Sequence, residues 1–404
     1  MPPEAAPLAR PAGAPRVYTP TLLTCVAISA LIHVATYTLH VVLPLHLVAL
    51  GGTKAQVGML FSVSAIASMF MRPAVGGWVD RYGVRPVLVP GVVALAITAV
   101  GFHLAATPAA VIALMAGLGL AAALVSMASG VLAASATPEA VRGEALSIYY
   151  VASSAAMAVG APLGLALMGW GGVALNFATV GGIAALLLAT ALLPTTRVPA
   201  RGAQGPRGLR LWSRHAVPAS VTLVLVAAGS SAIYAFVPLY AMRHGLEAHV
   251  GWFFALYSTW LLACRLLLRG AADRIGRARV LVASMAATAL GFFVLAAPPT
   301  APSLAASALL LGGGASVLYP ALVALVVDRT PSREHGLAIG TLSGSYDVGV
   351  VLGSAMIGLV VDRLSFAPGF AVAGAAALAG LAVFALGERR RAATAGSASR
   401  APGV

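Results

Sequence analysis

Apolar stretches of about 20 residues, each long enough to cross a bilayer as a helix, follow one another along nearly the whole chain. In lipid every backbone amide needs an internal hydrogen-bond partner, so such stretches are expected to be helical. Of the 404 residues, 60% are hydrophobic and 9% are charged, whereas about 25% are charged in an ordinary soluble domain. The sequence therefore predicts an all-α polytopic membrane protein.

Twelve stretches are expected to be transmembrane helices, and this even number places both termini on one side of the membrane. They cover residues 21–43, 57–78, 84–104, 109–132, 143–168, 174–194, 216–240, 250–270, 279–298, 303–327, 336–360 and 367–387. The predicted domains are an N-terminal tail at 1–20, a six-helix bundle at 21–194, a basic linker at 195–215, a second six-helix bundle at 216–387 and a C-terminal tail at 388–404.

The basic residues are distributed unevenly between the two predicted sides. Of the 25 Lys and Arg residues, only Lys54, Arg243 and Arg363 lie in loops on one side, two lie inside helices and 20 are left for the other side. Because positively charged loops stay in the cytoplasm, we expect both termini to be cytoplasmic and the chain to be a multi-pass protein of the inner membrane. The net charge of +14 then reflects topology, and no nucleic-acid partner is expected.

The two halves of the sequence repeat each other at an offset of 193 residues, and of 194 in the preceding helices, where Pro44-Leu45 matches Pro238-Leu239. Residues 57–89 align without a gap with residues 250–282. The polar and glycine pairs in this alignment are Gly58/Gly251, Arg72/Arg265, Gly77/Gly270, Asp80/Asp273, Arg81/Arg274 and Gly83/Gly276. Apolar helices match by chance, but paired Arg, Asp and Gly residues at fixed spacing do not. The repeat indicates two pseudo-symmetric six-helix halves related by an axis along the membrane normal.

Two loops carry a recognisable motif, GGWVDRYGVR at residues 76–85 after the second predicted helix and RGAADRIGR at 269–277 after the eighth. Both resemble the signature loop of the major facilitator superfamily. The resemblance implies the twelve-helix fold of that family and secondary active transport by alternating access. It also implies that Asp80 and Asp273 each meet the start of a helix in the opposite half, near Gly336 and Gly143, where the helix dipole favours an anion.

The resemblance and the repeat together predict a cytoplasmic gate. Its expected residues are Asp80, Arg81, Gly83, Arg85, Asp273, Arg274, Gly276, Arg72 and Arg265. Arg72 and Arg265 lie inside their predicted helices, where they either extend to the membrane surface or form a gate ion pair. The sequence names no partner for either arginine.

The fifth predicted helix contains Gly160-Ala161-Pro162-Leu163-Gly164, which is similar to a motif of the drug and metabolite antiporters of the family. The similarity implies efflux and a helix bend formed by Gly160, Pro162 and Gly164. The chain departs from the family pattern where an Ala separates Gly160 from Pro162, and where Ala113 stands at a position that is often Arg in proton-coupled exporters. We expect proton-coupled efflux of a drug-like compound or metabolite.

Two other functions are weighed against efflux. An uptake carrier for a metabolite, vitamin or metal chelate is the alternative within the same family. A membrane-embedded enzyme is disfavoured, since the spans contain no HExxH motif, no paired carboxylates and no P-loop. No cofactor and no metal site are expected, because a proton or other ion gradient would supply the energy. The expected partners are a small-molecule substrate and the lipid bilayer, and the chain is expected to be a monomer.

Asp347 is the only carboxylate deep inside a predicted span. It lies 11 residues after Gly336, which is about 16 Å along a helix. Burial disfavours the charged form of a carboxylate, so Asp347 is the predicted coupling residue for a proton or cation. The alternative is a structural carboxylate bonded to neighbouring hydroxyls.

The first predicted helix carries His33, Tyr37, His40 and Pro44 on one face, at the spacing i, i+4, i+7 and i+11. This face resembles the cavity lining of the family. Histidine can change its protonation near neutral pH or contact an anion, although a structural histidine bonded within the bundle is the alternative. The predicted cavity residues are His33, Tyr37, His40, Ser126, Tyr149, Ser153, Ser231, Tyr234, Tyr257, Trp260, Tyr319, Ser343 and Tyr346.

Overall fold

The computed structural model describes residues 18–135, 137–138, 141–196, 212–268, 274–331 and 334–398, and within these ranges it contains helices and no strand. The helices of the first half are α1 (Pro20–Ala49), α2 (Lys54–Tyr82), α3 (Arg85–Leu104), α4 (Pro108–Ser135) and α5 (Arg142–Ala191), followed by a short 3₁₀ turn (Pro194–Thr196). Those of the second half are α6 (Val217–Ala227), α7 (Ser230–Arg243), α8 (Ala248–Leu267), α10 (Arg277–Ala296), α11 (Ala301–Asp328), α12 (His335–Arg363) and α13 (Phe366–Ala398).

Each of the twelve predicted spans falls on a helix, and the predicted fold class is confirmed. In the described part, 11 segments are long and apolar enough to cross a membrane. One of them, α5, contains the fifth and sixth predicted spans, which are separated where Gly171 and Gly172 leave the helical conformation. The seventh predicted span is divided between α6 and α7. Helix α13 continues to Ala398, well beyond the expected membrane end at residue 387.

Local chemistry explains several helix ends. The Thr53 hydroxyl accepts from the backbone N–H of Gln56 and the Gln56 side chain accepts from the N–H of Thr53, which is a capping box at the start of α2. Gly83, which follows α2, and its repeat partner Gly276, which precedes α10, adopt φ angles of 87° and 93°. Only glycine takes up this left-handed backbone readily, which is a physical reason for its repetition in both signature loops.

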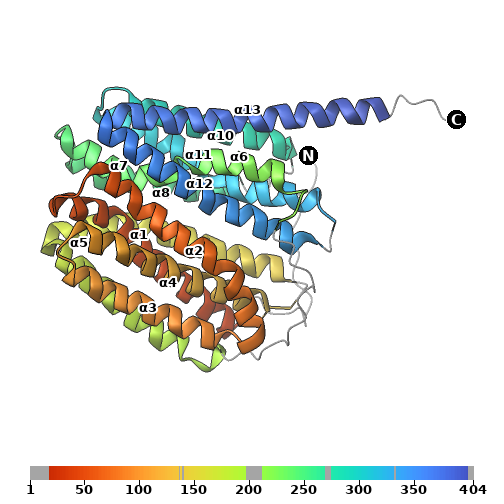
Figure 1. Cartoon of the computed structure of the whole chain (residues 1–404). Helices are drawn as coiled ribbons and strands as arrows, with labels where there is room; N and C mark the ends of the chain where they lie inside the picture. The colour runs from red at the N-terminus through yellow and green to blue at the C-terminus, as the bar shows by residue number, and fades with distance from the viewer. Residues whose placement is uncertain are drawn as a thin grey trace, which may run out of the picture.

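The two halves form two bundles, coloured red to yellow and green to blue in Figure 1. Close packing of α1 on α5 holds the first bundle together: a Cβ atom at Gly164 would lie 2.6 Å from the carbonyl oxygen of Thr38, and the Thr38 hydroxyl donates to the carbonyl of Gly160 over 2.9 Å. In the second bundle, a Cβ atom at Gly353 would lie 2.1 Å from the carbonyl of Ala228. Since Gly353 is the repeat partner of Gly160, both halves use one glycine position for close helix contact.

The halves meet along α2 and α12, which lie side by side in Figure 1. Near their ends, a Cβ atom at Gly58 would lie 3.0 Å from the Cα of Gly358, and the hydroxyls of Ser62 and Ser354 are 2.7 Å apart. The backbone N–H of Lys54 donates to Asp362 over 3.0 Å. We call this end of the molecule the Lys54 end. The helices of the two halves are therefore in direct contact there.

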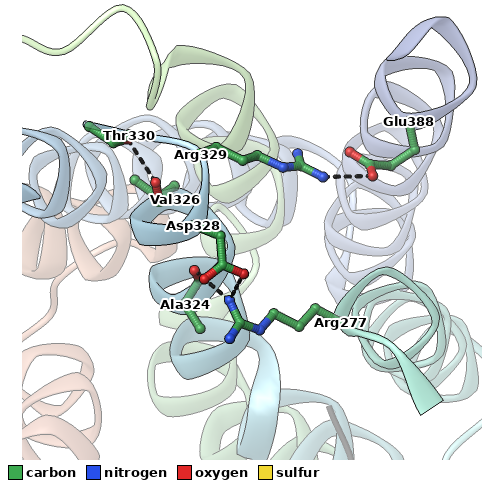
Figure 2. Close-up of polar contacts among 7 residues, drawn as sticks. All are labelled: Arg277, Ala324, Val326, Asp328, Arg329, Thr330 and Glu388. Carbon is green, nitrogen blue, oxygen red and sulfur yellow. Dashed lines mark hydrogen bonds and ion pairs between the residues drawn. The ribbon is translucent and has the colours of Figure 1, made fainter. Parts of the chain in front are cut away.

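At the opposite end of the second half, ion pairs connect three helices (Figure 2). Arg329, which follows α11, contacts Glu388 of α13 at 2.7 Å, and Arg277 at the start of α10 pairs with Asp328 at the end of α11. The Thr330 hydroxyl donates to the carbonyl of Val326 over 2.7 Å. These contacts connect α10, α11 and α13, and Glu388 lies in the part of α13 that the sequence had assigned to the C-terminal tail.

Candidate functional site

A cavity of about 170 Å³ lies between the two halves, lined by α1, α2, α4, α7 and α12. Six predicted residues line it: Tyr37, His40, Ser231, Tyr234, Tyr346 and Asp347. Two equivalent faces meet here, since an offset of 194 residues, which applies to these helices, carries Tyr37 and His40 of α1 onto Ser231 and Tyr234 of α7. The ring centroids of Tyr37 and Tyr234 are 5.2 Å apart, so helices one and seven join through an aromatic contact.

Asp347 forms an ion pair with Arg72 across the two halves. Asp347 is only 5% exposed, and its Oδ2 lies 2.8 Å from Nε of Arg72. That N–H does not point along the line to the oxygen, whereas Nη2 of Arg72 donates to Oδ1 over 3.5 Å. The contact is therefore chiefly electrostatic. It gives Arg72 a partner that the sequence could not name, and among the described residues the partner of Asp347 is this cation.

Arg265 also reaches across the halves, but its neighbours are neutral. It donates through Nη1 to the hydroxyl of Ser154 in α5 and through Nε to the carbonyl of Ser316, 3.0 Å away. Among the described residues, no carboxylate pairs with Arg265. The two symmetry-related arginines therefore have different electrostatic surroundings.

Several predicted cavity residues bond within one half and do not line this cavity. The Tyr149 hydroxyl lies 2.9 Å from Ser129 and donates to the carbonyl of Ser126 over 3.1 Å. The Ser153 hydroxyl lies 2.6 Å from that of Ser29. These bonds connect α1, α4 and α5, so they satisfy polar groups inside the first bundle.

In the second half, the hydroxyls of Tyr319 and Ser343 lie 2.7 Å apart and connect α11 with α12. Tyr257 is buried with its ring against Tyr234, and Trp260 is 40% exposed. His33 bonds through Nδ1 to the carbonyl of Ser29 over 2.7 Å, as expected for a histidine held within the bundle.

Sequence reasoning missed a polar face of α2. Phe61, Ser64 and Ser68 line the cavity and continue to Arg72 at the spacing i, i+3, i+7 and i+11. The same periodicity had identified the cavity face of α1, so the signal was present in the sequence. Serine is common in membrane helices, which made this face less conspicuous than the histidines and tyrosine of α1.

The predicted gate is described in part. Arg81 lies over the ring of Tyr82 at 5.3 Å and Arg274 is exposed, while Arg85 donates to the carbonyl of Leu192. The side chain of Asp80 and the whole of Asp273 lie outside the described residues. The predicted contacts of Asp80 and Asp273 with the opposite half therefore remain predictions.

The predicted bend motif lies inside α5. Gly160 and Gly164 face α1 closely, and the Asn176 side chain donates to the carbonyl of Gly164 over 2.9 Å. Pro162 lies within the helix, and the residues that leave the helical conformation are Gly171 and Gly172. The motif thus provides a close α1–α5 contact, and a bend at Pro162 stays a prediction.

The fold, the cavity between two related halves and the charged residues within spans together define a membrane transporter. The family model for the Major Facilitator Superfamily matches residues 25–268 and 219–403, and the chain belongs to this family. It is therefore a multi-pass secondary transporter, and the prediction that it is not an enzyme is confirmed.

Relatives and solved structures agree with this assignment. The uncharacterized MFS-type transporter YhhS of Escherichia coli K12 is 25% identical over 325 residues, 78% of each chain. An uncharacterized MFS-type transporter of Burkholderia mallei SAVP1 is 27% identical over 363 residues, covering 87% of this chain and 88% of the relative.

The crystal structure of the nucleoside transporter NupG has a TM-score of 0.72 at 16% identity and covers 91% of this chain and 99% of its own. A variant of the peptide transporter POT has a TM-score of 0.76 at 14% identity, covering 91% and 94%. At these identities the likeness concerns the fold alone.

Proposed function

We propose that this chain is a proton-coupled exporter of small amphipathic compounds, in which Asp347 binds the coupling proton. The Arg72–Asp347 ion pair is the observation that carries the proposal. Asp347 is the carboxylate among the cavity-lining residues, and it is almost fully buried. Protonation would remove its negative charge and with it the electrostatic contact between α2 and α12.

This contact lies where a change of charge can act on the relative position of the halves. Contacts between α2 and α12 run from the Lys54 end, through the Ser62–Ser354 bond, to Arg72 and Asp347. A proton that weakens the last of these contacts would bias the two halves toward another arrangement. Coupling then consists of a difference in proton affinity between the two arrangements.

Efflux is supported by the Gly160-Ala161-Pro162-Leu163-Gly164 motif and its close α1–α5 packing. With the basic side in the cytoplasm, the closely packed Lys54 end would face outward and the cavity would load from the cytoplasm. We further propose that both termini are cytoplasmic, that the monomer is the working unit and that no cofactor takes part.

Uptake is the second candidate, and the same ion pair supports it. Protonation of Asp347 leaves the positive charge of Arg72 free to attract an anionic substrate, so a proton and an anion could bind together. Binding of both to one arrangement is the requirement for symport.

The coupling proposal is tested in proteoliposomes that contain a pH-sensitive dye. Compounds from a library of amphipathic molecules are added, and a proton flux that depends on both compound and protein identifies a substrate. Asp347→Asn is expected to abolish this flux while the protein still folds. Asp362→Asn is the matched control, because Asp362 lies at the Lys54 end of the same helix. An undiminished flux in Asp347→Asn would remove Asp347 from the coupling role.

Direction is tested in cells. An identified substrate is measured inside cells that contain the transporter and in cells that lack it. Efflux predicts more retention in the cells without the protein, and uptake predicts less. The basic side is located separately by labelling single cysteines in the loops with an impermeant maleimide.

A further inference from the structure

The helix ladder of the seventh span is interrupted where the span borders the cavity. Helix α6 ends at Ala227 and α7 begins at Ser230, while Ala228 donates its N–H to Val224 and Ala232 donates to Gly229. Ser230 and Ser231, the first two residues of α7, line the cavity.

Gly229 allows this interruption to lie inside the packed bundle. A Cβ atom at this position would lie 2.5 Å from the ring of Phe292 and 3.3 Å from the Cβ of Ala373. A larger residue would push α7 away from its neighbours. The start of α7 is therefore held in place by packing.

Two buried hydroxyls in the first turns of α7 have no hydrogen-bond partner among the described residues. Ser231 is 4% exposed and Tyr234 is 7% exposed, and neither hydroxyl has a hydrogen bond among the described residues. Both side chains line the cavity, almost one turn apart on α7. Buried hydroxyls are usually paired, so this pair indicates the place of a ligand. Together the two hydroxyls offer two hydrogen-bond donors to the cavity.

The charges around the cavity favour an anion over a cation. Asp347 lines the same cavity, but its charge is compensated by Arg72, 2.8 Å away. In the equivalent pair, Arg265 meets the neutral side chain of Ser154. Among the described residues, this leaves one uncompensated positive charge between the halves, at a position within a membrane span where charge is costly.

We propose that the transported compound is an amphipathic organic anion. Its carboxylate, sulfonate or phosphate group accepts hydrogen bonds from the hydroxyls of Ser231 and Tyr234. Its apolar or aromatic part packs against Tyr37 and Phe61, which line the same cavity. This inference rests on the proposed transport function and specifies the class of substrate.

The test uses three compounds with the same ring and different permanent charge: benzenesulfonate, phenyltrimethylammonium and benzamide. Thermal unfolding of the purified full-length chain is followed against the concentration of each compound at constant ionic strength. We expect benzenesulfonate to raise the unfolding temperature in a saturable way and more strongly than the cation or the neutral amide. Equal or stronger stabilisation by phenyltrimethylammonium, or no saturable effect of benzenesulfonate, would overturn the inference.

Variants locate the effect. Ser154→Asp gives Arg265 the carboxylate that the other half provides, and it should weaken benzenesulfonate binding by more than about tenfold, since the added charge competes for the arginine and repels the anion. Ser154→Asn, which has nearly the same size and no charge, should retain binding. Ser231→Ala, which keeps every charge, should weaken binding several-fold. Unchanged binding in folded Ser231→Ala protein would contradict the site at α7.

Binding and coupling can fail separately in these experiments. The binding measurement needs no gradient, so it does not depend on the direction of transport or on Asp347 as the proton site. Saturable benzenesulfonate binding without proton flux would reject the coupling proposal and would still support the anion site. Proton flux driven by cations or neutral compounds, with no preference for the anion, would reject the anion site alone.

Discussion

Ser154 and Asp347 occupy equivalent positions in the two halves, and each side chain meets an arginine of the opposite half. Ser154 lies 12 residues after the start of α5 and Asp347 lies 12 residues after the start of α12. Their partners, Arg265 and Arg72, are themselves related by the 193-residue repeat. The two halves thus make the same cross-contact twice, once with a carboxylate and once with a hydroxyl.

The Arg72–Asp347 pair should behave as an energetic unit. Arg72→Gln and Asp347→Asn each leave one unpaired charge near the cavity, so each is expected to lower the free energy of unfolding by about 1–2 kcal/mol. The partial exposure of Arg72, 38% of its side chain, keeps this figure below that of a fully buried pair. The double variant removes both charges and should lose less than the sum of the two single changes.

Thermal or denaturant unfolding of the four proteins in detergent measures this coupling. The same cycle for Arg265→Gln and Ser154→Ala should give a smaller interaction energy, because a hydroxyl supplies no opposite charge. Additive effects of Arg72→Gln and Asp347→Asn would show that the ion pair contributes nothing to stability.

Gly164→Ala should separate α1 from α5. The added methyl group would lie 2.6 Å from the carbonyl oxygen of Thr38 and 3.1 Å from its Cα, and backbone atoms cannot move aside as a flexible side chain can. Overpacking of this kind costs about 1–3 kcal/mol. Gly169→Ala, in the same helix, is the control, since nothing lies within 4 Å of its added Cβ. Equal unfolding temperatures for the two variants would contradict the described packing.

Gly58→Val should open the Lys54 end. A Cβ atom at this position would lie 2.3 Å from the carbonyl oxygen of Ser354 in the opposite half. Because overpacking by about 1–3 kcal/mol opposes the closed contact, the population with this end open should rise about tenfold. The rate at which Ser354→Cys reacts with a maleimide, in a background without Cys25 and Cys264, measures the opening.

The repeat supplies the control for this experiment. Gly251 is the partner of Gly58 in the second half, and nothing lies within 4 Å of a Cβ atom there. Gly251→Val should therefore leave the labelling rate at the wild-type value. Faster labelling in both variants would point to general destabilisation.

Tyr234→Phe and Tyr149→Phe should have opposite effects. The Tyr234 hydroxyl has no partner among the described residues, so its removal should leave the unfolding temperature unchanged or raised, and substrate affinity should fall about three- to tenfold. The Tyr149 hydroxyl has two partners within the first half. Its removal should cost about 1 kcal/mol of stability and leave substrate affinity intact. Loss of stability in Tyr234→Phe would show that its hydroxyl is bonded in solution.

Helical periodicity in the sequence predicted several of the residues that line the cavity. The face of Tyr37 and His40 and its repeat at Ser231 and Tyr234 were identified from spacing, and these four residues meet in the cavity. Tyr149 and Ser153 were selected only because they are polar residues within a span, yet they bond inside the first bundle. Polarity alone does not distinguish a side chain that binds a ligand from one that binds a neighbouring helix.

The sequence by itself determined the number of spans, the two related halves and the family. These properties depend on hydrophobicity, length and spacing along one chain, and lipid permits few other backbone arrangements. Only the tertiary structure decided that Arg72 meets Asp347 and that Arg265 meets Ser154. The residues of each pair belong to different halves, more than 100 positions apart in the chain. Their contact depends on how the two bundles pack against each other, which no local pattern records.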